Sequence, residues 1–380
     1  MRYVHCLNKI SPVGLKQLPS EYKISDSLQE NVDAILVRSA VMHEMDLPKS
    51  VLCVARAGAG VNNIPLDKYA KEGVVVFNTP GANANAVKEL VIAMMLLACR
   101  DIRGSMNWVS ENKSDPEINK TMEKAKSAFA GTEILGKTLG VIGCGAIGAL
   151  VADAASKLGM KVLGVEPSMA VRERNASLLA NVEFVNNDEL YARSDFVTIH
   201  VPLMDATRGM LNKDAFSKMK DGVIIINAAR DALVNDDDLK AAIESGKVRK
   251  YVTDFPNAKT ANMDGVIAIS HLGASTEEAE DNCAVMAANQ IVNYIENGNI
   301  VNSVNYPNLT LGARTSSRVV VLFENKEGIL ERINQAVKPY LLSSQISGTK
   351  GNFGAFIADV SEEVKTLKEI PGVIRANFIK

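Results

Sequence analysis

The 380-residue sequence has few cysteines, and their arrangement excludes two common kinds of stabilising site. The five residues are widely spaced, odd in number and contain no CxxC pair: Cys6, Cys53, Cys99, Cys144 and Cys283. A disulfide framework or structural zinc site is therefore not expected. Only four histidines occur, none in an HExxH pattern, so we predict no metal centre. Reduced, mostly buried thiols of this kind are typical of a cytoplasmic protein.

Charge excess and long hydrophobic runs are also missing. The formal net charge is -2, whereas a general nucleic-acid binder needs a basic surface for phosphates. No apolar run approaches the roughly 20 residues of a membrane span. Residues 1–10 lack the pattern of a secretory signal. We therefore expect neither a nucleic-acid nor a membrane partner, and the length suggests two or three domains.

Short apolar runs that end at turn residues alternate with helical patterns. The helical pattern in the first part covers about Asn85 to Arg100, and residues 102–130 form a polar connection with weak patterning. Strand candidates are AILVRS, VLCVARAG and VVVFNTP before that connection, and KTLGVIG, KVLGVE, FVTIHV, GVIIINAA, YVTDF and VIAIS after it. Apolar runs without clean alternation suit a covered parallel sheet, which predicts a doubly wound α/β fold.

The C-terminal part predicts a separate small unit. A long helix is expected to end near Asn297, and residues 298–316 are rich in Asn, Ser, Pro and Gly, which is typical of a linker. Residues 317–380 then predict strand, helix, strand, strand, helix and strand, with the second helix at EEVKTLKEI. This βαββαβ order is the ferredoxin-like arrangement.

The segment VIGCGAIG carries a GxGxxG motif between a predicted strand and a predicted helix. Its glycines are Gly143, Gly145 and Gly148. They would allow a tight turn, close approach of a pyrophosphate and close helix packing, with the helix N-terminus facing the phosphates. Glu166 ends the next strand, where a carboxylate accepts hydrogen bonds from ribose hydroxyls and repels a 2′-phosphate. The pattern therefore predicts NAD in preference to NADP.

Two residues after predicted strands have the chemistry that hydride transfer to a keto acid requires. Arg230 offers a planar fork that matches a carboxylate, and His271 can exchange a proton near neutral pH. Position alone leaves open a surface salt bridge for Arg230 and a structural role for His271. His200 ends another strand and is expected to line the cofactor cleft without performing chemistry.

Seven motifs together resemble the D-2-isomer-specific 2-hydroxyacid dehydrogenases over nearly the whole chain: RAGAGVNNI, NTPGANANAVKEL, LGKTLGVIGCGAIG, HVPL, NAAR, TDFP and HLGAST. The tail, which ends in IPGVIRANFI, resembles an ACT regulatory domain. The resemblance implies two Rossmann-like doubly wound domains, with the substrate domain discontinuous, plus the ferredoxin-like ACT-like domain. The implied ranges are 1–100 and 283–310 for the substrate domain, 101–282 for the NAD-binding domain and 317–380 for the ACT-like domain.

The resemblance also assigns roles to residues. It makes Arg230 the catalytic arginine and His271 the acid/base. We predict the cofactor-binding residues to be Gly143, Gly145, Ala146, Ile147, Gly148, Glu166, His200, Val201, Pro202, Ala228, Arg230, Asp254, His271 and Gly273. The predicted substrate-binding residues are Arg56, Ala57, Gly58, Asn83, Arg230 and His271. Arg38 is a further candidate cation for a substrate phosphate.

One departure from the family pattern concerns the histidine. The family usually pairs it with a glutamate, which orients the ring, but TDFPNAK has Ala258 at the expected position. Three alternatives follow: a nearby acid such as Asp254 substitutes, the histidine works unpaired, or the protein binds cofactor and catalyses poorly. Ser270 also replaces the proline that usually precedes the histidine.

The function implied by the resemblance is NAD-dependent oxidation of D-3-phosphoglycerate to 3-phosphohydroxypyruvate, the first step of L-serine biosynthesis. The partners it implies are this small phosphorylated substrate, L-serine as a candidate effector at the ACT-like domain, and further copies of the chain in a homodimer or homotetramer. The first alternative is a hydroxypyruvate or glyoxylate reductase. The second is an NAD(H)-sensing binding protein, because fold alone does not fix function.

Overall fold

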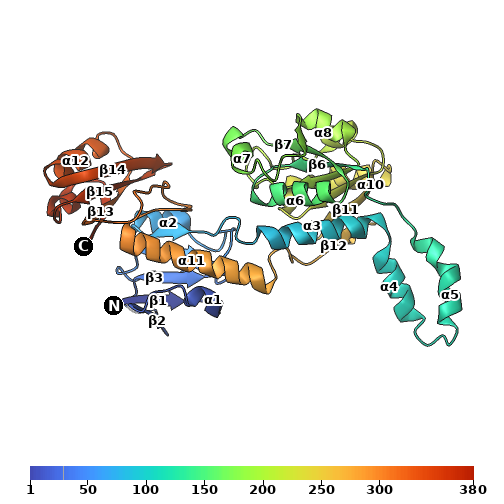
Figure 1. Cartoon of the computed structure of the whole chain (residues 1–380), viewed down its shortest axis with the longest axis horizontal. Coiled ribbons are helices and arrows are strands. Elements are labelled where there is room, and N and C mark those ends of the chain that lie inside the picture. The colour runs from blue at the N-terminus through green and yellow to red at the C-terminus, as the bar shows by residue number, and fades with distance from the viewer. Residues whose placement is uncertain (29) are drawn as a thin grey trace. The chain divides into compact units, whose positions relative to one another are not determined.

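The computed structural model describes residues 1–28 and 30–380 (Figure 1). They form two compact units, the first from Met1–Asn83 and Glu277–Lys380 and the second from Ala84–Thr276. The helix predicted near residues 85–100 is α3 (Ala84–Cys99), and it packs on helices and strands of the second unit. The domain boundaries at residues 100, 283 and 317 remain predictions.

The first unit contains a parallel sheet with the order β2-β1-β3-β4-β5. Its strands are β1 (Arg2–Cys6), β2 (Tyr22–Ser25), β3 (Ala34–Val37), β4 (Cys53–Arg56) and β5 (Val75–Phe77). Every residue of β3 is buried: Ala34 and Leu36 contribute to one core, Ile35 and Val37 to another. Helices cover the sheet: α1 (Pro12–Leu15), α2 (Leu66–Lys71) and the long α11 (Glu277–Asn297). The absence of alternation in AILV therefore has the predicted cause, which is burial on both faces.

The second unit contains a parallel sheet with the order β12-β11-β10-β9-β6-β7-β8. Its strands are β6 (Thr138–Ile142), β7 (Lys161–Val165), β8 (Val182–Phe184), β9 (Phe196–Ile199), β10 (Val223–Asn227), β11 (Val248–Thr253) and β12 (Val266–Ala268). One face packs on α3 and α6 (Ala146–Lys157); other helices of the unit are α7 (Met169–Arg174), α8 (Asn187–Arg193), α9 (Lys213–Lys218) and α10 (Asp236–Glu244). Chain order reverses between β6 and β9, so their carboxyl ends open the crevice where such folds bind ligands.

The C-terminal residues form a small antiparallel sheet with the order β14-β15-β13-β16. Its elements are β13 (Arg318–Glu324), α12 (Ile329–Val337), β14 (Leu341–Lys350), β15 (Phe353–Val360) and β16 (Val373–Ile379). The predicted α-helix at EEVKTLKEI is wrong, because the segment forms only a short 3₁₀ helix at Lys365–Glu369. Just Val364 and Leu367 bury apolar side chains there, which is too few to hold two helical turns.

The predicted polar connection at residues 102–130 is instead helical. It forms α4 (Ile102–Glu111), α5 (Ile118–Ala125) and a 3₁₀ turn at Lys126–Phe129, and together α4 and α5 extend away from the sheet of their unit (Figure 1). Neither helix buries a residue among those described, and Met106 is 68% exposed. The sequence showed only weak patterning here because the apolar side chains of these helices do not pack on the core of their own unit.

The interpretation of residues 298–316 as a linker is also wrong. The Asn305 side chain donates a hydrogen bond to Val74 O at 2.9 Å and accepts one from Val76 N at 2.9 Å. The hydroxyl of the fully buried Tyr306 donates to Ala70 O at 2.6 Å. Through these contacts the segment provides hydrogen-bond partners for backbone groups of β5 and of the residues just before it. The segment is therefore an ordered part of the first unit.

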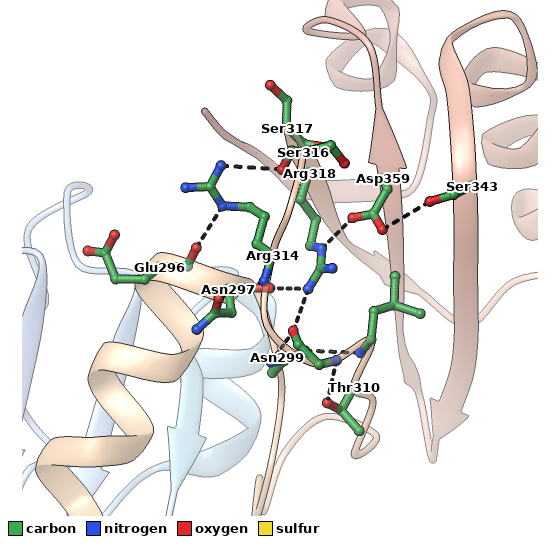
Figure 2. Close-up of polar contacts among 12 residues, drawn as sticks. Glu296, Asn297, Asn299, Thr310, Arg314, Ser316, Ser317, Arg318, Ser343 and Asp359 are labelled. Carbon is green, nitrogen blue, oxygen red and sulfur yellow. Dashed lines mark hydrogen bonds and ion pairs between the residues drawn. The ribbon is translucent and has the colours of Figure 1, made fainter.

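The C-terminal sheet is joined to α11 through buried arginine contacts (Figure 2). Arg318, only 1% exposed, donates to Asp359 Oδ1 at 2.7 Å, to Asn297 O at 2.7 Å and to Gly312 O at 3.0 Å. Arg314 donates from Nε to Glu296 O at 2.9 Å. The two guanidinium groups thus cap carbonyl groups at the end of α11, where a positive charge also suits the helix dipole.

One face of the C-terminal sheet shares a hydrophobic core with the parallel sheet of its unit. Val320 and Leu322 from β13 lie in the same cluster as Phe77 and Ile291, whereas Val319 and Val321 face the core beneath α12. The central strands β13 and β15 are therefore buried on both faces, whereas the edge strand β14 is mostly exposed. Among the described residues, no helix has the length and apolar character needed to cross a membrane.

Candidate cofactor and catalytic site

Two of the three motif glycines meet a steric demand of the fold, and the third leaves open space in front of the loop. Gly143 follows β6 with φ of 87°, and a Cβ there would lie 2.8 Å from His200 O. A Cβ on Gly148 would lie 1.9 Å from Gly143 O, so only glycine lets α6 begin this close to the strand. Gly145 has open space where a side chain would be, and it precedes α6 without a side-chain cap. The loop therefore fits a dinucleotide pyrophosphate at a helix N-terminus.

Glu166 lies beside this loop, at the end of β7. Its carboxylate accepts hydrogen bonds from Cys144 N at 3.1 Å and from Ser168 N at 3.0 Å. The residue is 9% exposed, so the carboxylate is held in one position by backbone donors on both sides. Arg172 donates to the Glu166 carbonyl at 2.6 Å and lies 4.1 Å from the Phe184 ring centre. A ribose bound at this strand end would meet a fixed negative charge.

His200 follows β9 on the opposite side of the crevice. Its Nε2 is 3.0 Å from Thr198 Oγ1, and its buried Nδ1 has no hydrogen-bond partner among the described residues. Burial lowers the pKa of His200 to about 4, so the ring is neutral near pH 7. A neutral imidazole with one unpartnered nitrogen suits contact with a polar cofactor group, and it agrees with giving His200 no proton-transfer role.

The loop after β10 is shaped by Asn227, which the sequence analysis quoted within NAAR without a role. The buried amide donates to Arg230 O at 2.7 Å and to the Tyr251 hydroxyl at 3.0 Å. Its Oδ1 accepts from Ala229 N at 3.0 Å and from Arg230 N at 3.3 Å. Asn227 therefore holds the turn that carries Ala228 and Arg230.

An aromatic ring that the sequence analysis missed lies next to both predicted catalytic residues. The Arg230 Cζ is 5.0 Å from the centre of the Phe255 ring, which is 4.2 Å from the His271 ring centre at an interplanar angle of 44°. Arg230, Phe255 and His271 are thus brought together in the second unit. The available signal was position, because Phe255 is the last residue of the predicted strand YVTDF.

Of the candidate substrate residues of the first unit, Arg56 and Gly58 lie together, next to Arg38. Arg56 donates from Nε to Arg38 O at 3.2 Å, and a Cβ on Gly58 would lie 1.9 Å from Arg56 Nη1. Gly58 therefore leaves room for the guanidinium. Arg38 pairs with Glu280 at 2.7 Å. Ala57 is buried next to Gly58, and Asn83 is the last residue before the second unit begins.

Comparisons with known proteins identify the family. Residues 92–273 match the D-isomer specific 2-hydroxyacid dehydrogenase, NAD binding domain. A hydroxypyruvate reductase from Thermotoga maritima is 37% identical over 279 residues, which cover 70% of this chain and 86% of the relative. The chain belongs to the D-isomer-specific 2-hydroxyacid dehydrogenases. It is an α/β enzyme family, and the second unit of this dehydrogenase carries the NAD-binding fold.

One further relative and one solved structure also cover most of this chain. A D-3-phosphoglycerate dehydrogenase from Archaeoglobus fulgidus is 35% identical over 302 residues, 78% of this dehydrogenase and 53% of the relative. The chain thus spans about half the length of that relative. The crystal structure of a glyoxylate reductase from Paecilomyes thermophila superposes with a TM-score of 0.64 and 26% identity, over 80% of this chain and 98% of the other.

The dehydrogenase departs from the expected family pattern beside His271. Ala258 is exposed, and its carbonyl accepts a hydrogen bond from Asn262 Nδ2 at 2.8 Å. The acid nearest in electrostatic effect is Asp254, whose carbonyl accepts from His271 N at 2.9 Å and whose Oδ2 accepts from Gly273 N at 3.0 Å. Asp254 is 1% exposed, so a buried residue fixes the main chain of the loop that carries His271.

Burial determines the protonation behaviour of Asp254. Burial raises the pKa of its carboxyl group, although the Gly273 hydrogen bond and the charges of His271 and Arg230 act in the opposite direction. Its Oδ1 has no hydrogen-bond partner among the described residues. A buried acid with an open acceptor, next to a histidine, is the arrangement expected if Asp254 takes over the function of the missing glutamate.

Proposed function

We propose that this NAD-dependent 2-hydroxyacid dehydrogenase oxidises D-3-phosphoglycerate to 3-phosphohydroxypyruvate. The observation that carries the proposal is the cluster of Arg230, Phe255 and His271 in the unit that holds the glycine loop. Support for the phosphorylated substrate comes from the Archaeoglobus fulgidus relative and from Arg56 in the first unit, whose guanidinium is held by a hydrogen bond from Nε to the backbone carbonyl of Arg38.

The chemistry divides between the protein and the cofactor. NAD, when bound, supplies the acceptor for the hydride that leaves C2 of the substrate. Arg230 pairs its planar guanidinium with the substrate carboxylate, which fixes C2 relative to the cofactor. His271 accepts the proton of the 2-hydroxyl group through its imidazole and returns it in the reverse direction. Glu166 would accept hydrogen bonds from the adenosine ribose, and the glycine loop at the α6 N-terminus would hold the pyrophosphate.

Asp254 positions the histidine in this proposal. It holds the main chain of His271 and Gly273, and its negative charge would stabilise the imidazolium that forms during oxidation. The residue does not need to touch the substrate for this. In the first unit, Arg56, Ala57, Gly58 and Asn83 are proposed to hold the remaining polar groups of the substrate.

The test is NADH consumption by the purified protein with phosphohydroxypyruvate, beside hydroxypyruvate, glyoxylate and 2-oxoglutarate. A strong preference for the phosphorylated acid is expected. His271→Asn should abolish turnover and keep NADH binding, whereas His43→Asn should match the wild type, since His43 is an exposed histidine bonded to Asn62 O. Preference for hydroxypyruvate would support the second candidate, which the 37% identity to the Thermotoga maritima reductase favours. NADH binding without turnover of any acid would refute both.

Assembly is proposed from the helical arm of the second unit. Met106 and Val109 on α4 and Met122 on α5 are between 46% and 68% exposed, and such an apolar stripe is best covered by a second copy of the chain. A homodimer is therefore proposed, with a homotetramer as the larger alternative. Sedimentation of Met106→Glu beside the wild type tests this, because a charge in the interface should shift the protein to monomer.

A further inference from the structure

Two arginines of the first unit lie at the carboxyl edge of its parallel sheet. Arg56 is the last residue of β4, and Arg38 directly follows the neighbouring strand β3, whose last residue Val37 lies opposite Arg56. Open α/β sheets bind their ligands outside the carboxyl ends of the strands. Both arginine side chains therefore start from the edge at which a substrate is expected.

Main-chain contacts fix the loop that carries Arg38. The Asn8 side chain accepts hydrogen bonds from the backbone N of Arg38, Ser39 and Ala40 at 3.1, 3.1 and 2.9 Å. The Arg38 carbonyl in turn accepts the hydrogen bond from Arg56 Nε. The Arg38 guanidinium can therefore change its partner while its own main chain stays in place.

The long helix α11 brings a negative charge to the same edge. The helix lies against β3 and β4, and Glu280 in its first turn forms the 2.7 Å ion pair with Arg38 (Figure 1). The two side chains are 39% and 43% exposed. Water and salt screen an ion pair of this kind, so it contributes little to stability. A ligand with a higher negative charge can therefore displace the glutamate from Arg38.

The three charges also act on one buried group, the thiol of Cys283. Cys283 lies one turn beyond Glu280 on α11, and burial raises the pKa of its thiol. The charges of Arg56 and Arg38 act against this rise, and the charge of Glu280 adds to it. Two positive charges and one negative charge thus lie within electrostatic reach of the same side chain. Glu280 cancels half of the positive charge that the arginines offer to a ligand.

We propose that Glu280 is a specificity-determining residue, which competes with the far end of the substrate for Arg38. The far end is the group on C3, a phosphate in D-3-phosphoglycerate and a hydroxyl in D-glycerate. A phosphate monoester carries about −1.5 to −2 charges at pH 7 and has to take Arg38 from the glutamate, whereas a hydroxyl leaves the pair intact. Glu280 therefore lowers the affinity for the phosphorylated acid relative to the unphosphorylated one. This inference rests on the proposed function, because it concerns the same substrate.

The experiment measures binding without turnover, in the complex of the full-length protein with NADH. D-3-Phosphoglycerate and D-glycerate are titrated calorimetrically; they differ only in the phosphate group, and reduced cofactor cannot oxidise either. In Glu280→Gln the affinity for D-3-phosphoglycerate should rise about tenfold, as for the removal of one charge beside a dianion in a solvent-screened site. The affinity for D-glycerate should stay the same. Equal changes for both probes, or no change for either, overturn the proposal.

Glu278→Gln is the matched control. Glu278 lies in the same first turn of α11, but residues two positions apart do not share a helix face. The control removes the same charge from the same helix end, so both affinities should equal those of the wild type. The gain in Glu280→Gln should also shrink between about 0.01 M and 1 M salt, since the Debye length falls from about 30 Å to about 3 Å. A gain that is independent of salt contradicts a competition between charges.

A second variant tests whether Arg38 mediates the effect. Arg38→Gln should weaken the binding of D-3-phosphoglycerate and leave that of D-glycerate unchanged. In the Arg38→Gln background, Glu280→Gln should give a smaller gain than it gives in the wild type, because the two residues act through one contact. An equal gain in both backgrounds overturns the competition for Arg38.

The catalytic proposal fails in a different way. A chain that turns over neither phosphohydroxypyruvate nor hydroxypyruvate refutes the proposed function, whereas the two affinities still report on Glu280. Turnover of phosphohydroxypyruvate with unchanged affinities in Glu280→Gln refutes the role of Glu280 alone. If D-3-phosphoglycerate binds neither the wild type nor Glu280→Gln, the role of Glu280 and the proposed substrate are both wrong.

Discussion

Replacing Arg318 with methionine should destabilise the first unit by an amount that the contacts allow us to work out. The substitution leaves the Asp359 carboxylate, 5% exposed, with Ser343 Oγ at 3.4 Å as its remaining side-chain donor (Figure 2). It also removes the Arg318 donor from Asn297 O and from Gly312 O, although Gly312 O still accepts from Asn299 Nδ2 at 2.9 Å. Removing one partner of a buried ion pair costs about 3–5 kcal/mol, because the other charge stays buried. We expect a loss of that size in the free energy of unfolding.

The double variant Arg318→Met with Asp359→Leu separates the two parts of this cost. It leaves no buried charge, so the remaining loss should be about 1–3 kcal/mol from the Asn297 carbonyl, which loses its arginine donor. The double variant should therefore be more stable than Arg318→Met alone. If the ion pair contributed only the attraction between its two charges, the double variant would instead be no more stable than Arg318→Met.

Hydrogen exchange of β13 and β15 amides in urea is the suitable assay, because the only tryptophan, Trp108, lies in the second unit and does not report on the first. Arg193→Met is the control, since Arg193 pairs with Glu183 at 2.7 Å on the surface, where solvent screens the pair, and its loss should change the stability little. If Arg318→Met costs no more than Arg193→Met, the reasoning from burial is wrong.

Three other predictions concern the second unit. Glu166→Ala should lower the ratio of kcat/KM with NAD to that with NADP, since the 2′-phosphate no longer meets a fixed carboxylate; an unchanged ratio would reject the assignment. Asp254→Asn keeps an acceptor for Gly273 N but removes a negative charge beside His271, so the limb of the pH–rate profile assigned to the histidine should move to lower pH. An unmoved limb would mean that Asp254 does not replace the missing glutamate. Because burial lowers the pKa of His200 to about 4 from an unfolded value near 6.5, the unfolded state takes up a proton first as the pH falls, and stability is lost between those values. The loss should reach at most about 3 kcal/mol, from 1.36 kcal/mol for each pKa unit, and His200→Gln should flatten the dependence of the urea midpoint on pH over this range.

The features that could be predicted from the sequence are those set by local chemistry. The glycine motif was found from its spacing between a predicted strand and a predicted helix, and Glu166 from its place at the end of the next strand. Strands that are buried on both faces of a sheet have continuous apolar sequences, such as AILV and VIIIN. Most strands of the second unit were therefore found. Arg230 was found because it stands at a strand end and has distinctive chemistry.

The features that were missed depend on partners far away in the chain or outside it. The amide of Asn305 acts on β5, whose residues are more than 200 positions earlier, and an asparagine-rich segment alone resembles a linker. The apolar side chains of α4 and α5 have no core of their own to define a face. No role could be assigned to Phe255 from the sequence, because its role depends on its contacts with Arg230 and His271, which are known only from the structure.

The role of Asn305 has a practical consequence for anyone who would shorten this protein. Its side chain and the bridge between Phe77 and Ser303 cover the outer edge of β5, the last strand in its sheet. Cutting the chain after α11 to obtain a catalytic core would uncover that edge together with its apolar strand. Unprotected edge strands pair with one another between molecules. The shortened product should therefore be recovered as aggregate, and a soluble one would need a replacement for the segment from 298 to 316.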